Sequence, residues 1–350
     1  EDRARVRTTA VATRAKDGRR RQKKHAAAGS PVVVATMSFL TACGRLNLAP
    51  AYTPRLFELV GPAVRSTGDV AHLTALAQLA AKLGLTGCVS EVESIWCAVH
   101  ARFEASVQLQ AARTSTRGFA SQVVYGQLLL ALVFDESSSA PRDRALTTAV
   151  AAVCATFSSA LSALDERLAR QLQVAELACR LERPAALDAL TDRGLLPFLE
   201  DVSRLEHSVM PLTKGSSQQH LQVSGVLQDL GVRHSLEEKL SPYVADVRVR
   251  GGAQLIEIDG PLHFVGASNR YDLKSMLKHR LLTKQGWQVH HIAWNDWPVK
   301  YHSRLNYISK LLRSPPPGRK LHEYHALESN ASVTSSAVLP LGAALDSAAS

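Results

Sequence analysis

The stretch Tyr243–Phe264, which reads YVADVRVRGGAQLIEIDGPLHF, decides how the C-terminal part of the chain folds. Two runs rich in β-forming residues, Val244–Val249 and Gln254–Ile258, stand on either side of Gly251-Gly252. Because both glycines can adopt a positive φ, the pair predicts a tight turn, and the two runs predict a β-hairpin. This hairpin is the expected centre of a C-terminal domain.

Acidic side chains gather on this hairpin. Glu257 and Asp259 are two residues apart, so on one strand they point to the same face. Asp246 on the partner strand can project to that face as well, and His263 follows shortly after the second strand. Carboxylate oxygens grouped in this way can bind a divalent cation. The alternative is a structural role, with Asp259 serving the following turn and Asp246 pairing with an arginine such as Arg280.

A basic helix and a further strand follow the hairpin. Residues 271–285 have helical periodicity, with an apolar stripe formed by Leu273, Met276, Leu277 and Leu281. Gly286 suits the end of this helix, and Trp287–Ala293 reads as the next strand. Strand, strand, basic helix and strand together predict a small α/β domain.

The order of these motifs resembles the RAP domain, a C-terminal module of RNA-handling proteins in organelles. The resemblance covers residues 217–313 and implies a fold similar to restriction-endonuclease-like, PD-(D/E)XK nucleases, notably the very-short-patch repair type. The matching elements are the Asp246 strand, Glu257–Phe264, the Lys278–Leu282 helix, Gly286-Trp287 and Trp294–Trp297.

The nuclease similarity implies catalysis by Asp246, Glu257, Asp259 and His263, with the three carboxylates as Mg²⁺ ligands. The chain departs from that pattern, because the lysine of E-x-K is replaced by Asp259. A lysine at this position helps to place or activate water. Without it, His263 would have to serve, or Lys278 or Arg280 would have to reach over from the helix. A metal-dependent endoribonuclease is therefore an alternative reading, and no cofactor is expected if the domain only binds RNA.

The RAP resemblance implies RNA binding, and the composition of this region agrees with it. Basic groups hold phosphates, and exposed aromatic rings stack on unpaired bases. Trp287 begins a strand and is expected in the core, whereas Trp297, next to Pro298, is the better stacking candidate. The predicted RNA-binding residues are Arg270, Lys274, Lys278, Arg280, Lys284 and Trp297.

Residues 31–209 are expected to be helical. The stretches Leu40–Leu48 and Ala77–Leu85 look related at a spacing of 37 residues, which suits a helix-turn-helix repeat. Such repeats resemble the octotricopeptide-like or FAST-kinase-domain arrays that precede RAP domains. An irregular helical bundle is the alternative. The predicted helices are 32–46, 53–66, 70–83, 88–104, 119–134, 142–157, 164–181 and 185–190.

Composition narrows the class of protein further. A net charge of +10 and a pI near 9.6 favour an anionic partner, nucleic acid before a membrane surface. No apolar run approaches the ~20 residues needed to span a bilayer. The five cysteines form no C-x-x-C, so they read as buried thiols in a reducing compartment and argue against a disulfide framework or a zinc site.

Both ends of the chain are expected to be disordered. Residues 1–30 are rich in Arg and Lys, which suits the remains of an organelle transit peptide, a nuclear localisation signal or a nucleic-acid-binding tail. The chain does not begin with Met, and its N-terminus is expected to be incomplete or processed. Residues 210–216 read as a linker, and residues 314–350 begin with the proline run Pro315-Pro316-Pro317 and are rich in Ser and Ala.

Together these features predict a solenoid-like helical repeat region followed by a restriction-endonuclease-like RAP domain. The expected function is binding of single-stranded RNA in a mitochondrion, or alternatively a plastid. The resemblance implies roles in RNA processing, stability, ribosome assembly or translation, with an organelle ribosome or RNA-processing proteins as partners. A third reading is a helical scaffold that docks other proteins and carries a relic nuclease fold.

Overall fold

The computed structural model describes residues 31–46, 52–67, 69–83, 89–112, 120–136, 139–205, 218–265 and 269–316. The predicted basic segment 1–30, the predicted linker 210–216 and nearly all of the predicted tail lie outside these ranges. Within them, every helix is too short or too polar to cross a membrane.

The N-terminal part is helical, as predicted. The expected helices are all present, α4 with the predicted ends and the others with shifted ends, and α10 was not predicted. The elements are α2 (Pro31–Leu46), α3 (Thr53–Thr67), α4 (Val70–Leu83), α5 (Val89–Ala112), α6 (Gln122–Val133), α7 (Ala140–Phe157), η2 (Leu161–Ala163), α8 (Glu166–Glu182), α9 (Pro184–Asp192) and α10 (Leu196–Ser203).

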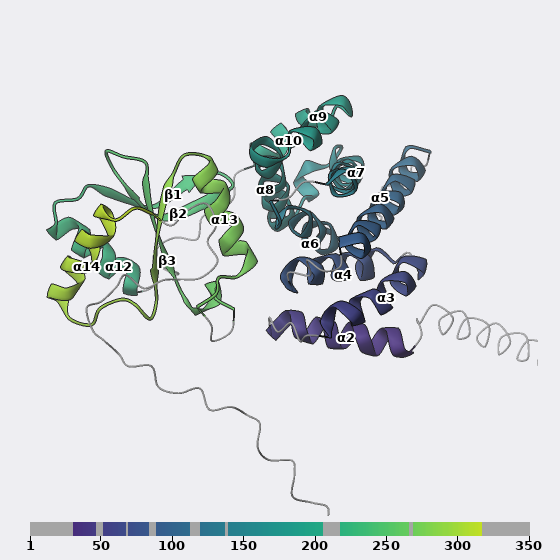
Figure 1. The fold of residues 1–350 in the computed structure, drawn as a ribbon. Coiled ribbons are helices and arrows are strands. Elements are labelled where there is room, and N and C mark those ends of the chain that lie inside the picture. Colours follow the sequence, from purple (N-terminus) through teal and green to yellow (C-terminus); the bar gives the residue numbers. More distant parts are fainter. Residues whose placement is uncertain are drawn as a thin grey trace, which may run out of the picture.

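These helices pack in two layers (Figure 1). Helices α2, α4, α6 and α8 contact one another in succession, and α3, α5, α7 and α9 do the same. One continuous apolar core runs between the layers and fully buries large side chains such as Trp96, Phe103 and Tyr125. Each helical pair therefore buries its apolar face against the next pair along the chain.

The described cysteines are free thiols, as the sequence predicts. Cys43 and Cys179 are buried, Cys154 is half-buried, and Cys97 is exposed on α5, so the prediction that all are buried was wrong for Cys97 and only partly met by Cys154. Cys88 lies outside the described residues.

The C-terminal part contains a four-stranded sheet in the order β1-β2-β3-β4. Its strands are β1 (His234–Leu240), β2 (Tyr243–Val249), β3 (Gln254–Asp259) and β4 (Gln288–Ala293). The predicted hairpin is β2–β3, with Val247 opposite Ile256, and Gly251 in its turn has a φ of 92°. Strand β4 is parallel to β3, with Glu257 opposite His291. The edge strand β1 was not predicted.

Helices cover both faces of the sheet (Figure 1). On one face α12 (Gln218–Asp229) and α14 (Tyr301–Arg313) pack against a core that includes Val247, Ile256 and Ile292. On the other face lies α13 (Leu273–Lys284), which is the predicted basic helix. Asp272 caps its N-terminus. A short turn of 3-10 helix, η3 (Pro261–His263), follows β3.

Helix α13 also joins the sheet to the helical region. Its Leu277 and Leu281 belong to the core of the helical region. Its Arg280 donates hydrogen bonds of 2.8 Å to the carbonyl oxygens of Val133 and Phe134, at the end of α6. The same guanidinium is 2.8 Å from Glu182 Oε1 on α8. Helix α13 is therefore packed on two sides, against the sheet and against α6 and α8.

Candidate functional site

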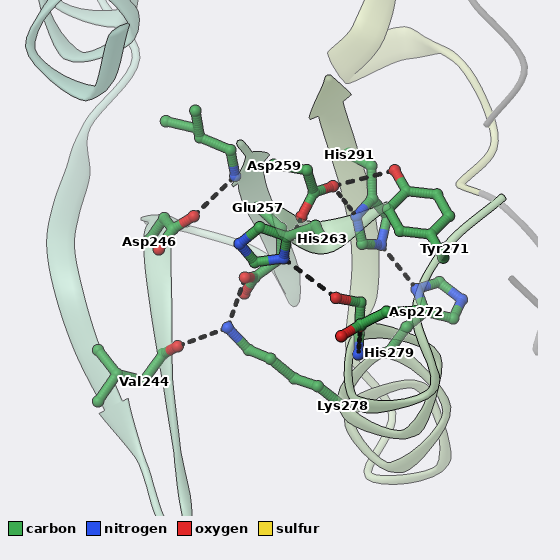
Figure 2. A network of polar contacts seen from close by, with 12 residues as sticks. Val244, Asp246, Glu257, Asp259, His263, Tyr271, Asp272, Lys278, His279 and His291 are labelled. Atoms are coloured by element: carbon green, nitrogen blue, oxygen red, sulfur yellow. Dashed lines mark hydrogen bonds and ion pairs between the residues drawn. The ribbon is translucent and has the colours of Figure 1, made fainter. Parts of the chain in front are cut away.

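The predicted acidic residues lie in a polar network between β2, β3 and α13 (Figure 2). Glu257 and Asp259 alternate with apolar residues on β3, and both are almost fully buried, at 4% and 2% exposure. Two carboxyl groups at such depth need compensating donors or positive charges. The surrounding elements provide these partners.

Lys278 on α13 is the partner of Glu257. Its Nζ lies 2.5 Å from Glu257 Oε2 and donates a second hydrogen bond, of 2.7 Å, to the carbonyl oxygen of Val244. Burial raises the pKa of Glu257 to about 7, against the lowering effect of Lys278. Burial alone would lower the pKa of Lys278, but neighbouring carboxylates, that of Glu257 first, raise it above its usual value. The helix thus brings a lysine to the carboxylates, whereas Arg280 points away from them.

Asp259 is held by a chain of aromatic and imidazole groups. Its Oδ2 lies 2.6 Å from His291 Nδ1 and accepts a hydrogen bond of 3.0 Å from the Tyr271 hydroxyl. The other ring nitrogen of His291, Nε2, lies 2.9 Å from His279 Nδ1. Burial acts to raise the pKa of Asp259, but His291 and His263 outweigh it and hold that pKa below its usual value. Asp259 is therefore a buried, charged group whose orientation is fixed.

His263 occupies the open side of the network. Its Nδ1 lies 3.3 Å from Asp259 Oδ1 and 3.1 Å from Ser275 Oγ, and its side chain is 43% exposed. Of the four predicted catalytic residues it is the most accessible to a ligand.

Asp246 lies beside this network and does not pair with Arg280, so that predicted partner was wrong, although Asp246 does hold structural contacts. Its Oδ2 accepts a hydrogen bond of 2.7 Å from the backbone N–H of Ile258. His220 on α12 lies 3.6 Å from the same oxygen, and this contact raises the pKa of His220. His220 was not predicted as part of the site, because nothing in the sequence around it points to a strand that follows later in the chain.

The residues present do not fit the Mg²⁺ site that a nuclease fold implies. Within the described ranges, no three His, Cys, Asp or Glu side chains are grouped so that they could hold a metal ion. Asp246, Glu257 and Asp259 instead accept hydrogen bonds from the protein. Glu257 Oε1 is the exception, since it is buried with no hydrogen-bond partner.

Some of the predicted RNA-binding cations form contacts within the protein, and others are exposed. Lys278 and Arg280 are engaged in the contacts above, and Lys284 Nζ lies 2.6 Å from Glu136 Oε1 and 3.4 Å from Glu182 Oε1. Arg270 and Lys274 are exposed. Three of the five predicted cations therefore stabilise the fold.

Trp287 packs against the apolar core, as expected, but Trp297 is not the exposed stacking ring that was predicted. Trp297 is partly buried, where its Nε1 donates a hydrogen bond of 2.8 Å to Gln222 and its ring meets the edge of Tyr307. Trp287 is partly buried under the guanidinium of Arg248. Trp294, directly after β4, is 52% exposed. Trp294 is therefore the more accessible stacking surface.

Comparison with known families identifies a domain in the C-terminal part. Residues 256–311 match the RAP domain, and this range covers most of β3, all of α13 and β4, and most of α14. No curated protein matches the chain. The similarity of the C-terminal region to the RAP domain, which the order of its motifs indicates, is thereby confirmed over residues 256–311.

Proposed function

We propose that this protein binds single-stranded RNA in a mitochondrion or, alternatively, a plastid. The observation that carries the proposal is the match of residues 256–311 to the RAP domain, a domain generally associated with RNA binding. The net charge of +10 supports it, because phosphate contacts dominate the affinity of proteins for nucleic acids. The role would be in RNA processing, stability, ribosome assembly or translation.

The layered helices support a division of labour between the two parts. Successive helical pairs that each contact the next favour a repeat array, and such arrays present long binding surfaces. In this proposal the helical region supplies an extended surface and the RAP-like domain anchors the RNA.

A salt titration tests the proposal. Binding of fluorescein-labelled single-stranded RNA to the full chain is followed by fluorescence anisotropy between 50 and 500 mM KCl. We expect log K to fall linearly with log salt, with a slope of about −0.7 for each phosphate contacted. Absence of binding, or binding that salt does not change, would instead favour the protein-docking scaffold.

An endoribonuclease is the second candidate, because α13 places Lys278 beside Glu257 where the E-x-K pattern lacks its lysine. The network could move a proton at His263, the accessible imidazole beside Asp259. The chain is incubated with labelled RNA, with Mg²⁺ or with EDTA, beside the double variant Asp246→Ala/Glu257→Ala. Cleavage by the wild type but not by the variant would favour the enzyme, whereas intact RNA with both proteins would favour a binding module.

A further inference from the structure

A groove lies where the helical region meets the sheet domain. It has a volume of about 850 Å³ and is lined by side chains from α4, α6 and α8 on one side and from β2 and α13 on the other. Figure 1 shows α13 on the side of the sheet that faces α6 and α8. Arg280 joins α13 to α6 and α8 at this junction. The groove therefore exists only when the two parts of the chain are docked.

The charge of this groove is positive and largely uncompensated. Lys82, Arg167 and Lys274 are exposed in its lining, and among the described residues none of the three has an acidic partner. Both acids of the lining are already engaged. Asp165 accepts a hydrogen bond of 2.7 Å from the backbone N–H of Arg167, and Glu166 lies 3.1 Å from Arg170. With Arg170, the lining carries four cations and two carboxylates, a net charge of +2, and Lys82, Arg167 and Lys274 are its exposed cations without an acidic partner among the described residues.

The rest of the lining suits unpaired bases better than a duplex. Gln127 and Gln171 bring amide groups that can bond to base edges, and Val123 is an apolar side chain at 51% exposure. Unpaired bases offer both their edges and their faces to such groups, whereas a duplex hides them within the stack. Cations that follow the phosphate backbone are a usual part of a single-strand site.

We propose that single-stranded RNA lies in this groove, with its phosphates at Lys82, Arg167 and Lys274. The inference rests on the proposed RNA-binding function and adds the position of the bound RNA on the protein. The site is composite, because α4 and α8 provide two of the cations and α13 provides the third. Neither part of the chain would carry it alone.

The test compares charge reversals inside and outside the groove, in the full chain. The groove variant is Lys82→Glu/Lys274→Glu. The matched control is Lys239→Glu/Lys300→Glu, which changes two exposed lysines outside the lining by the same net charge. Two lost phosphate contacts reduce the steepness of the salt slope for a single strand by about 1.4. The loss of affinity relative to wild type should therefore be about 25-fold larger at 50 mM than at 500 mM salt. We expect this change for the groove variant and the wild-type slope for the control.

The outcomes separate the two claims. Equal salt slopes for the wild type, the groove variant and the control would overturn the proposal that RNA binds in the groove. Weak, salt-independent binding by the wild type would overturn the proposed function itself. The neutral variant Lys82→Gln/Lys274→Gln guards against misfolding from reversed charge, and it should show the same loss of slope with an unchanged melting temperature.

Discussion

Lys278 Nζ and Glu257 Oε2, 2.5 Å apart, form an ion pair that joins α13 to the middle of β3. The carboxyl is 4% exposed, so its charge is stable there only because the ammonium is adjacent. Through Glu257 and the carbonyl oxygen of Val244, Lys278 connects α13 to both strands of the β2–β3 hairpin. This pairing also explains why a basic residue that sequence analysis assigns to RNA is not on the surface.

Replacing Lys278 by Met is expected to destabilise the protein by about 3–5 kcal/mol at pH 8, because a buried carboxylate loses its partner. The loss should be smaller at pH 6. The pKa of Glu257, already raised to about 7, rises further once Lys278 no longer lowers it, so the folded variant keeps a proton that the unfolded chain releases. Stability of the variant therefore falls as pH rises from about 5 to 8. Denaturant unfolding at each pH measures this.

The matched control for that experiment is Lys239→Met, which alters an exposed lysine and should change stability by less than about 0.5 kcal/mol. The double variant Lys278→Met/Glu257→Gln removes both charges and should recover part of the loss at pH 8. Equal destabilisation at pH 6 and pH 8 would show that the carboxyl does not titrate as described.

Arg280→Lys is expected to loosen the junction between the helical region and the sheet. The guanidinium bonds Val133, Phe134 and Glu182 together, and the single ammonium of lysine cannot reproduce that geometry. We expect a loss of about 2–4 kcal/mol and faster proteolytic separation of the two parts. Limited proteolysis with denaturant unfolding checks both, with the exposed Arg204→Lys as control. A variant as resistant to protease as the wild type would rule out the junction role.

Local pattern was enough for part of the fold. Gly251-Gly252 specified the β2–β3 hairpin, and the apolar stripe through Leu277 and Leu281 specified α13. Strand β1 was not predicted, because apolar and polar residues do not alternate in its sequence, HSLEEKL. Glu237 also interrupts the regular strand with a φ of 50°. Its place at the sheet edge comes from pairing with β2, which is a tertiary effect.

In the candidate site, too, local sequence predicted some contacts but not those that depend on tertiary packing. Glu257 and Asp259 could be paired on one face from their spacing alone, and Lys278 could be considered as a partner. The role of Arg280 could not be read, because a cation on a helix has the same spacing whether it faces solvent or another domain. Its partner Glu182 lies 98 residues earlier in the chain. The packing of α13 on α8 determines which cations of α13 are bound to acidic side chains and which are exposed to a ligand.

Asp259→Asn should change the response of stability to acid. The pKa of Asp259 is held below its usual value, so its contribution is present at neutral pH and is lost as pH falls through that lowered pKa. The amide does not titrate, so the variant should be less stable by about 2–4 kcal/mol at pH 7 but approach the wild type below pH 4. Tyr271→Phe removes one hydrogen bond and should cost about 1 kcal/mol. Parallel unfolding curves for Asp259→Asn and wild type across this range would contradict the assignment.

Trp294 and Trp297 should separate binding from stability. Trp294 is 52% exposed, so Trp294→Ala should leave unfolding within about 0.5 kcal/mol of wild type. If its ring stacks on a base, the same change weakens RNA binding by about 1–3 kcal/mol. Trp297 contacts Gln222, Arg304 and Tyr307, so Trp297→Ala should cost about 2 kcal/mol of stability.

Anisotropy titrations at fixed salt, together with denaturant curves, measure both quantities for each tryptophan variant. Trp294→Phe keeps an aromatic face and should retain most of the affinity that Trp294→Ala loses, because stacking tolerates any flat ring. Loss of affinity with Trp297→Ala and none with Trp294→Ala, both at full stability, would return the stacking role to Trp297. The exposed ring at the end of β4 would then be incidental to RNA binding.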